Sequence, residues 1–321
     1  MRDIYAGAEE VILFLGDGVN HRISTAYLTQ PLPSPVVFWN DSRDDSHLQL
    51  FRDSSKALWK QKSWNAFYLI CLIRILSQEG DFSFAKAAIE AVNGQRRREL
   101  FELLRRLAVE PWWHRIWVVQ EVAISPKVTV RYGNVTAPWD MFVQVAENTQ
   151  SHDYSLTLEA EYAKVLSLFT RQVLDIENLR GEWEANKGTD LLSLLQRFSD
   201  RKATDERDKV YALLGLARRH QFLVPDYSTS IDNLYQSTAI TLIGSYGNLA
   251  PLSGDLKRKN SRSLASWIPD WSAIFDKSDR ERMVLYRTYH ACSNWRITVF
   301  EPPEKYLNYV AREMGRLVTS P

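Results

Sequence analysis

A glutamate in an apolar stretch is the first residue of this sequence that could do acid–base chemistry. Glu121 stands within residues 118–123, which are otherwise apolar apart from one glutamine. His114 could complete an acid–base pair with it, but a single helix over residues 112–123 would separate the two by about 10.5 Å of rise, too far for a direct hydrogen bond. We expect Glu121 to be a partly buried carboxylate held by an arginine, with a catalytic or ligand-binding role as the alternative.

An arginine in an acidic helix start is the second candidate. The segment Thr204–Leu216 carries Asp205 and Asp208 in its expected first turn, where carboxylates oppose the positive end of the helix dipole. Asp205 and Lys209 are also spaced as a helical ion pair. Helix stability does not require Arg207, whose guanidinium could bind a buried carboxylate or a ligand phosphate. We favour the structural ion pair and keep the ligand contact as the alternative.

A carboxylate between two indoles is the third candidate. Asp270 follows Pro269 and lies between Trp267 and Trp271 in an extended segment. Such a rigid, aromatic segment suits either the bridging of loops or the lining of a pocket. We favour the bridging role, and we expect Arg115 or Arg207 to pair with a buried carboxylate such as this one.

Motifs of the common catalytic and metal sites are missing from the sequence. It contains no Gly-x-Ser-x-Gly elbow, no phosphate loop, no His-Glu-x-x-His and no Cys-x-x-Cys, and its six histidines are scattered. The pair Gly16-x-Gly18 lacks a third glycine, because His21 stands there. We therefore expect no metal site and no cofactor.

The elements that must position these candidates are mostly helical. Apolar residues recur with helical spacing, and Pro111 closes one of the expected helices. Thr204 should cap a helix that ends at Gly215, and Ser230 should cap the next one. Further helices are expected over residues 112–123, from Pro138 onwards, over 155–180 and over 190–199.

Strands are few in this reading. The apolar run Val11–Leu15 is typical of a strand buried on both faces, and nothing before it supplies a neighbouring strand, so part of its sheet would be missing. Val128–Tyr132 should enter a hairpin at Gly133-Asn134. The proline-rich and polar residues 29–53 are expected to be a surface insertion without chemistry. After residue 272 we expect a possible strand at 296–300 and a terminal helix.

Composition narrows the class of protein. The 321 residues are 45% hydrophobic and 12% aromatic, enough for a large core, and the formal net charge of +1 argues against a nucleic-acid binder. Two cysteines cannot build a disulfide framework, which favours a reducing, cytoplasmic location. The most apolar stretch, residues 66–76, is interrupted by Arg74 and is shorter than the ~20 residues that a membrane span needs.

Five segments, in order, resemble the later motif blocks of the heterokaryon-incompatibility (HET) domain of filamentous fungi. The two most specific are Pro-Trp-Trp-His-Arg-Ile-Trp-Val-Val-Gln-Glu at 111–121 and Ala-Thr-Asp-Glu-Arg-Asp-Lys-Val-Tyr-Ala-Leu-Leu-Gly-Leu at 203–216. The others cover residues 1–16, 224–228 and 264–272. The residues that match the motifs are Arg115, Trp117, Gln120, Glu121, Asp205, Arg207, Asp208, Lys209, Tyr211, Pro225, Asp226, Tyr227, Trp267, Pro269, Asp270 and Trp271.

The resemblance implies a fold and a domain arrangement. It implies an α+β, predominantly helical domain over residues 1–275, the remnant of an α/β core similar to TIR domains, with added helices and a small β-hairpin. The opening motif block of the family has no counterpart here, so the domain is expected to be truncated at its N-terminus. Residues 276–321 would then be a C-terminal extension.

The resemblance also implies a function. It implies a cytoplasmic module of fungal self/non-self recognition that signals cell death through protein partners or self-association. TIR-like folds can hydrolyse NAD, so an enzyme with NAD as substrate and with Glu121 and Arg207 as catalytic candidates is the alternative. An inactive remnant is the third possibility. Because the opening strands are missing, we expect the chain as given not to turn over NAD.

Overall fold

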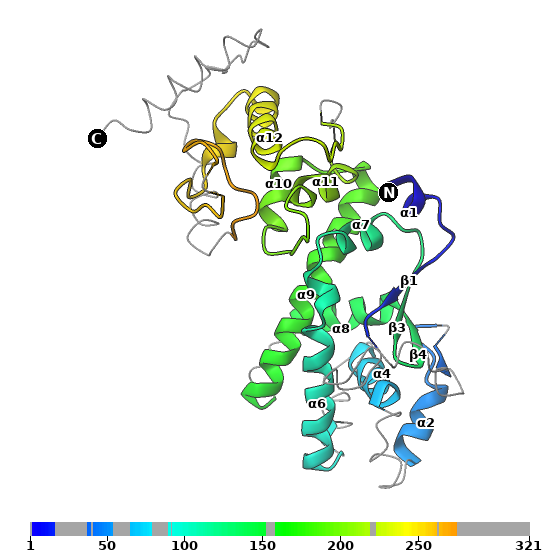
Figure 1. Ribbon diagram of the computed structural model, residues 1–321. Helices are drawn as coiled ribbons and strands as arrows, with labels where there is room; N and C mark the ends of the chain where they lie inside the picture. The colour runs from blue at the N-terminus through cyan, green and yellow to red at the C-terminus, as the bar shows by residue number, and fades with distance from the viewer. Residues whose placement is uncertain are drawn as a thin grey trace, which may run out of the picture. The chain divides into compact units, whose positions relative to one another are not determined.

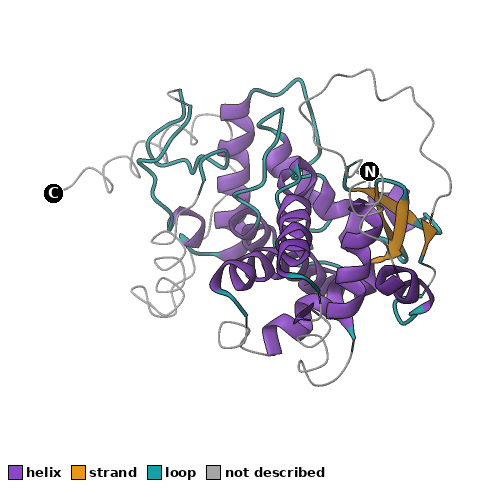
Figure 2. Ribbon diagram, turned by 90° about the horizontal axis from the view of Figure 1, so that it is seen from below, coloured by secondary structure: helices purple, strands orange, loops and turns teal. Residues whose placement is uncertain are grey.

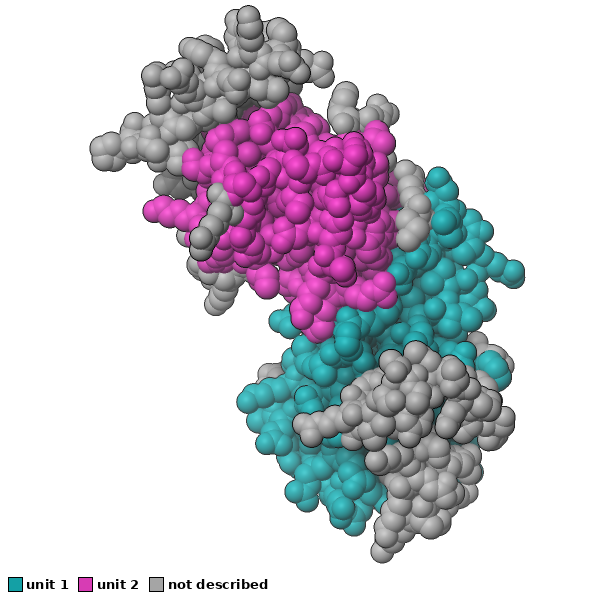
Figure 3. Space-filling model, in the orientation of Figure 1, with its two compact units in different colours: residues 1–113, 121–182 teal, residues 114–120, 183–321 magenta. Residues whose placement is uncertain are grey.

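The computed structural model describes residues 2–16, 37–39, 41–53, 65–78, 89–90, 92–151, 158–218, 223–261 and 263–274. The chain divides into two compact units, shown in teal and magenta in Figure 3. Unit 1 comprises residues 1–113 and 121–182, and unit 2 comprises residues 114–120 and 183–321. The described residues form many helices and one four-stranded sheet, which confirms a predominantly helical α+β fold.

The sheet belongs to unit 1 and is drawn in orange in Figure 2. Its strands are β1 (Val11–Phe14), β2 (Val37–Phe38), β3 (Val128–Tyr132) and β4 (Val135–Pro138), in the order β1-β3-β4-β2. β3 and β4 form the expected antiparallel hairpin, turning at Gly133 with a left-handed φ of 58°. The outer strands β1 and β2 pair parallel with β3 and β4, respectively.

One face of this sheet is packed, whereas the side chains that β1 turns to the other face are exposed. Leu13 pairs with Val130, which in turn pairs with Ala137, and all three are almost fully buried. Ile12 and Phe14 point to the opposite face and are 59% and 52% exposed. The expectation that β1 is buried on both faces is therefore wrong. Its continuous apolar sequence did not reveal that helices cover a single face.

Several helices of unit 1 pack against one buried helix, α4 (Asn65–Ser77; Figure 1). In α4 every residue after the first is buried, and α4 contacts both α8 (Trp139–Ser151) and α6 (Gly94–Ala108). Rings of the core lie in a row from Trp113 through Trp139 and Phe142 to Phe169. Other described helices of the unit include α1 (Arg2–Ala6), α2 (Ser46–Asp53) and the long α9 (Ala160–Asn186), which ends in unit 2.

The segment expected as one helix over residues 112–123 is broken. It consists of the 3-10 helix η3 (Pro111–His114) and, after three irregular residues, the short helix α7 (Val118–Ala123). The break arises because the backbone around Arg115 forms a bridge with Lys202, and Ile116 donates its N–H to the Lys202 carbonyl at 2.9 Å. The separation of His114 from Glu121 that one continuous helix would impose therefore does not apply.

The described helices of unit 2 include α10 (Leu191–Arg197), α11 (Asp208–Leu214), α12 (Ile231–Tyr246) and the 3-10 helix η5 (Ala250–Leu252). Ser230 caps α12 as expected, its hydroxyl accepting from the N–H of Asn233 at 3.3 Å. The expected cap at Thr204 is wrong. α11 begins four residues later, at Asp208. The residues before it form a turn, in which the N–H of Arg207 donates to Asp205 Oδ1 at 3.0 Å.

The described part of residues 29–53 is more than surface. Residues 37–38 form β2, α2 follows, and Trp39, Leu48 and Phe51 are buried. These residues differ from the expected surface insertion in joining the core of unit 1. The possible strand at 296–300, and residues 275–321 generally, lie outside the described residues. Across the described ranges, no helix has the length and apolar character needed to cross a bilayer.

Candidate functional site

The candidate site of unit 2 centres on Arg207, whose guanidinium binds Asp205 bidentately. Its Nε donates to Oδ1 at 2.9 Å and its Nη2 to Oδ2 at 2.7 Å. This hydrogen bonding lowers the pKa of Asp205 and raises that of Arg207. The expected structural ion pair is present, but its carboxylate is partly exposed and only two residues away, rather than buried and distant.

The same guanidinium reaches the following motif block. Arg207 Nη1 donates to the carbonyl of Tyr227 and to that of Thr229, the latter at 3.2 Å. Its central carbon also lies 5.3 Å from the centroid of the Tyr227 ring, within cation–π range. Arg207 therefore ties the turn at residues 226–229 to the start of α11.

Two tyrosines complete this connection. The Tyr227 hydroxyl donates to Asp208 Oδ1 at 2.6 Å, and the Tyr211 hydroxyl donates to the Asp226 carbonyl at 2.8 Å. The two rings meet edge to face with centroids 5.2 Å apart. Burial, followed by the bond to the Asp208 carboxylate, raises the pKa of Tyr227, so its hydroxyl remains a donor at neutral pH.

Asp226 closes the turn that these tyrosines hold. Its Oδ1 accepts from the N–H and the hydroxyl of Ser228 at 2.8 and 2.6 Å, and its Oδ2 accepts from the Thr229 hydroxyl at 2.9 Å. These bonds, above all those from Ser228, lower the pKa of Asp226. The preceding Pro225 is exposed. We call Asp205, Arg207, Asp208, Tyr211, Asp226 and Tyr227 the arginine clasp.

Lys209, which follows Asp208 in the sequence, is buried. Its ammonium donates to the carbonyl of Ser199 at 2.8 Å and to that of Arg201, and the side chain is not paired with Asp205 as its helical spacing had suggested. Burial lowers the pKa of Lys209, while Asp200, Asp270 and Glu206 act in the opposite direction. The lysine thus joins α11 to the residues that follow α10.

The buried carboxylate of Asp270 is held by N–H and O–H donors. Oδ2 accepts from the backbone N–H groups of Asn260 and Ser261 at 2.7 and 3.1 Å. Oδ1 accepts from the N–H and the hydroxyl of Ser272 at 2.9 and 2.6 Å. The expectation of an arginine partner for Asp270 is wrong, because these four donors meet its charge locally. The neighbouring Trp267, Pro269 and Trp271 are buried.

The motif residues around α7 divide between the two units. Gln120 is 2% exposed and donates from Nε2 to the Ala212 carbonyl at 2.5 Å, so the second and third motif blocks are in contact within unit 2. Trp117 is half-buried and Arg115 is exposed. Glu121 is half-buried and belongs to unit 1, whereas Arg207 belongs to unit 2.

Unit 1 holds a polar cavity that the sequence did not reveal. Its volume is about 240 Å³, and its charged lining residues are Asp41, Lys127, Asp140 and Arg180. Arg180 is held in place by the carbonyls of Val122 and Ser125 at 2.6 and 2.9 Å. No motif contains these residues, which come from four separate segments, so only the fold could bring them together.

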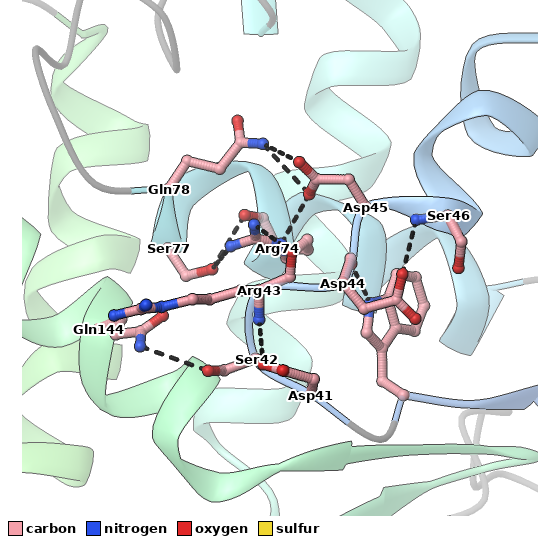
Figure 4. A network of polar contacts seen from close by, with 11 residues as sticks. Asp41, Ser42, Arg43, Asp44, Asp45, Ser46, Arg74, Ser77, Gln78 and Gln144 are labelled. Atoms are coloured by element: carbon pink, nitrogen blue, oxygen red, sulfur yellow. Dashed lines mark hydrogen bonds and ion pairs between the residues drawn. The ribbon is translucent and has the colours of Figure 1, made fainter.

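A second polar network of unit 1 surrounds the buried guanidinium of Arg74 (Figure 4). Its Nε donates to Asp45 Oδ1 at 2.8 Å, its Nη2 to the Arg43 carbonyl at 3.1 Å and its Nη1 to the Ser77 hydroxyl at 3.1 Å. Gln78 donates to the same aspartate at 3.1 Å. Arg74, which interrupts the apolar run of α4, therefore anchors the loop that leads into α2.

Across the part of the chain that the structure describes, no group of three or more His, Cys, Asp or Glu residues is arranged to hold a metal ion. Cys71 is buried in α4, and burial raises the pKa of its thiol well above the ordinary value.

Comparison with known proteins identifies one informative relative. No family model matches the chain, and no solved structure matches it. Heterokaryon incompatibility protein 6, OR allele, of Neurospora crassa is 23% identical over 338 aligned residues, which include 94% of this chain. The chain spans 45% of that protein's length. This distant homology supports the membership of the heterokaryon-incompatibility family that the ordered motif blocks predicted.

Proposed function

We propose that the chain is a cytoplasmic module of fungal self/non-self recognition that signals cell death through protein interaction. The observation that carries the proposal is the extent of the distant homology. It includes 94% of the chain, although identity is only 23%. The match therefore extends over most of the chain rather than one short segment.

The contacts of the motif residues support a signalling role rather than catalysis. In the arginine clasp, Arg207 is engaged by the Asp205 carboxylate and by two backbone carbonyls. Asp270 and Lys209 are likewise held by backbone groups of their own unit. The contacts of Arg207 hold the motif blocks at residues 203–216 and 224–228 in one defined arrangement. A surface of defined shape is what recognition by a protein partner requires.

The sheet of unit 1 supports the finer proposal of a core related to TIR-like α/β folds. Its two parallel pairs, β1 with β3 and β2 with β4, join strands that are distant in the chain. Helices α4 and α8 pack beside the hairpin, as crossover helices pack on the sheet of an α/β protein.

Expression in a filamentous fungus tests the proposal. Strains that produce the chain would be fused with strains that lack it, and dying compartments would be counted by uptake of a vital dye. We expect death in the fused cells, and we expect Arg207→Ala to reduce it. The matched control is Arg98→Ala, which removes an exposed arginine of unit 1 outside the motif blocks. Full viability of fused cells that contain folded protein would refute the proposal.

The enzymatic alternative has its own measurement. Purified protein would be incubated with NAD, and nicotinamide release would be followed over time. We expect no turnover above the buffer control. Steady turnover that disappears in Glu121→Gln would make the NAD-hydrolysing enzyme the leading hypothesis.

A further inference from the structure

The open edge of the sheet at β1 is a surface that the proposed function does not assign. β1 stands at one end of the strand order, and in the part of the chain that the structure describes no strand lies beyond it. The backbone N–H groups of Val11 and Leu15 donate toward β3, to the carbonyls of Lys127 and Arg131, both at 2.9 Å. Because successive residues of a strand face opposite ways, the N–H and C=O groups of Ile12 and Phe14 face the open edge.

The residues of β1 itself lack the features by which a strand protects its own edge in monomeric proteins. Soluble proteins protect an edge with lysine, proline, bulges or very short strands, and residues 11–15 contain neither lysine nor proline. The side chains of Ile12 and Phe14 are 59% and 52% exposed beside the open backbone groups. The opposite edge, β2, has only two residues and is too short to template another strand.

We propose that β1 pairs antiparallel with β1 of a second copy of this chain, joining the two sheets into one. A two-fold axis beside Leu13 would place Ile12 of each copy opposite Phe14 of the other. Those two residues carry the open backbone groups, so each such pair exchanges two hydrogen bonds. On the exposed face the isoleucine of each copy packs against the phenylalanine of the other, an aromatic–aliphatic pair of the kind that stabilises sheets.

The charges beside the strand are compatible with this register. The register that pairs Ile12 with Phe14 brings Glu10 of one copy opposite Gly16 of the other, so the two Glu10 carboxylates stay apart. Each Glu10 is also paired within its own chain, with Lys127 Nζ at 3.1 Å and with the Thr129 hydroxyl. A parallel pairing of the two strands would instead align the carboxylates and lacks the two-fold symmetry of most homodimers.

This pairing adds a partner, a second copy of the chain, to the proposed function. Only the biological role of the pairing rests on that proposed function. The two can fail separately, because the pairing is tested by mass and amide exchange rather than by cell death. Sedimentation of the full chain should show twice the monomer mass of 37.2 kDa at hundreds of micromolar protein. A chain that stays monomeric under these conditions would overturn the proposal.

Charge variants test the register. Ile12→Lys alone and Phe14→Glu alone should each weaken association at least tenfold, since each places a charge opposite an apolar side chain. An equal mixture of the two variants should associate again, because the introduced ammonium then faces the introduced carboxylate. The matched control is Phe38→Lys on β2, where the side chain is 57% exposed, and it should leave the mass unchanged. Association that resists both single variants, or that is not restored in the mixture, would refute this pairing.

Amide exchange separates edge pairing from contact through the sheet face. The amides of Ile12 and Phe14 should exchange more slowly as the protein concentration rises. The Leu13 amide, which faces β3, should be protected at every concentration. A dimer that leaves the Ile12 and Phe14 amides unprotected would show that the copies meet through another surface.

Discussion

Gln120 and Gly215 lie in direct contact, and the contact leaves no room for a side chain at position 215. A Cβ added there would lie 2.7 Å from Gln120 Nε2, and the same nitrogen donates to the Ala212 carbonyl at 2.5 Å. The backbone of Gly215 has an ordinary helical φ of −63°. The glycine is therefore required by the close approach of the second motif block to the third, rather than by its backbone conformation.

Gly215→Ala should destabilise the protein by about 1 to 3 kcal/mol, because the buried glutamine has to shift to admit the methyl group. The matched control is Gly181→Ala, at an exposed site in α9 where an added Cβ meets nothing within 4 Å. There the loss of backbone freedom in the unfolded chain should stabilise the protein by about 0.4 to 1 kcal/mol. Urea unfolding of both variants gives the comparison, and equal effects at the two sites would contradict the contact.

Ser230→Ala should cost about 0.5 to 1 kcal/mol, since it removes the side-chain cap of α12. Thr204→Ala should change the free energy of unfolding by no more than about 0.5 kcal/mol, because Thr204 is an exposed residue ahead of a helix that begins at Asp208. Thermal or urea unfolding measures both variants. A larger effect of Thr204→Ala than of Ser230→Ala would indicate that Thr204 does cap a helix, as the sequence alone suggested.

Asp270→Asn should destabilise unit 2 by about 3 kcal/mol, because the new amide group turns a donor toward backbone N–H groups that need an acceptor. The control is Asp226→Asn, an exposed site where the remaining carbonyl can still accept from Ser228. Unfolding should be followed by tryptophan fluorescence, which Trp267 and Trp271 report. An unchanged free energy of unfolding in Asp270→Asn would mean that the four donors find other acceptors.

The stabilising contribution of Glu102 should depend on pH. Its hydrogen bonds from Arg105 and Arg106 lower its pKa from 4.5 to about 2. A carboxylate with a lowered pKa stabilises the fold fully above the unfolded pKa and loses this contribution as the pH falls toward 2. The difference between the wild type and Glu102→Gln in urea unfolding should therefore be constant above pH 4.5 and shrink below it. Because Glu102 is partly exposed, the difference should be small and sensitive to salt.

Local signals in the sequence predicted local structure correctly. The Gly133-Asn134 turn, the strand before it and the cap at Ser230 all depend on residues that are close in the chain. The broken helix at Arg115 was not predictable in this way, since its cause is a backbone bridge to Lys202. A propensity pattern cannot register a partner that is so distant in sequence.

The candidate site shows the same division. Arg207 and Asp270 could be selected as candidates from their residue types in unusual settings, but their hydrogen-bond partners could not be predicted. Asp270 is satisfied by backbone N–H groups, which every residue except proline possesses and which therefore leave no trace in the sequence. The cavity beside Arg180 draws on separated segments without a motif, so its residues had no sequence signal.

The parallel pairing of β1 with β3 has a consequence for the synthesis of the protein. Val11 pairs with Val128, so the strand that β1 pairs with among the described residues is not made until more than a hundred further residues have been added. At a rate of about 5 to 20 residues per second, this interval lasts roughly 6 to 23 seconds. During that time the apolar stretch Val11–Leu15 is available to chaperones and to other nascent chains. Slower translation between the two strands should therefore lower the yield of native protein, and a chaperone that binds extended apolar segments should restore it.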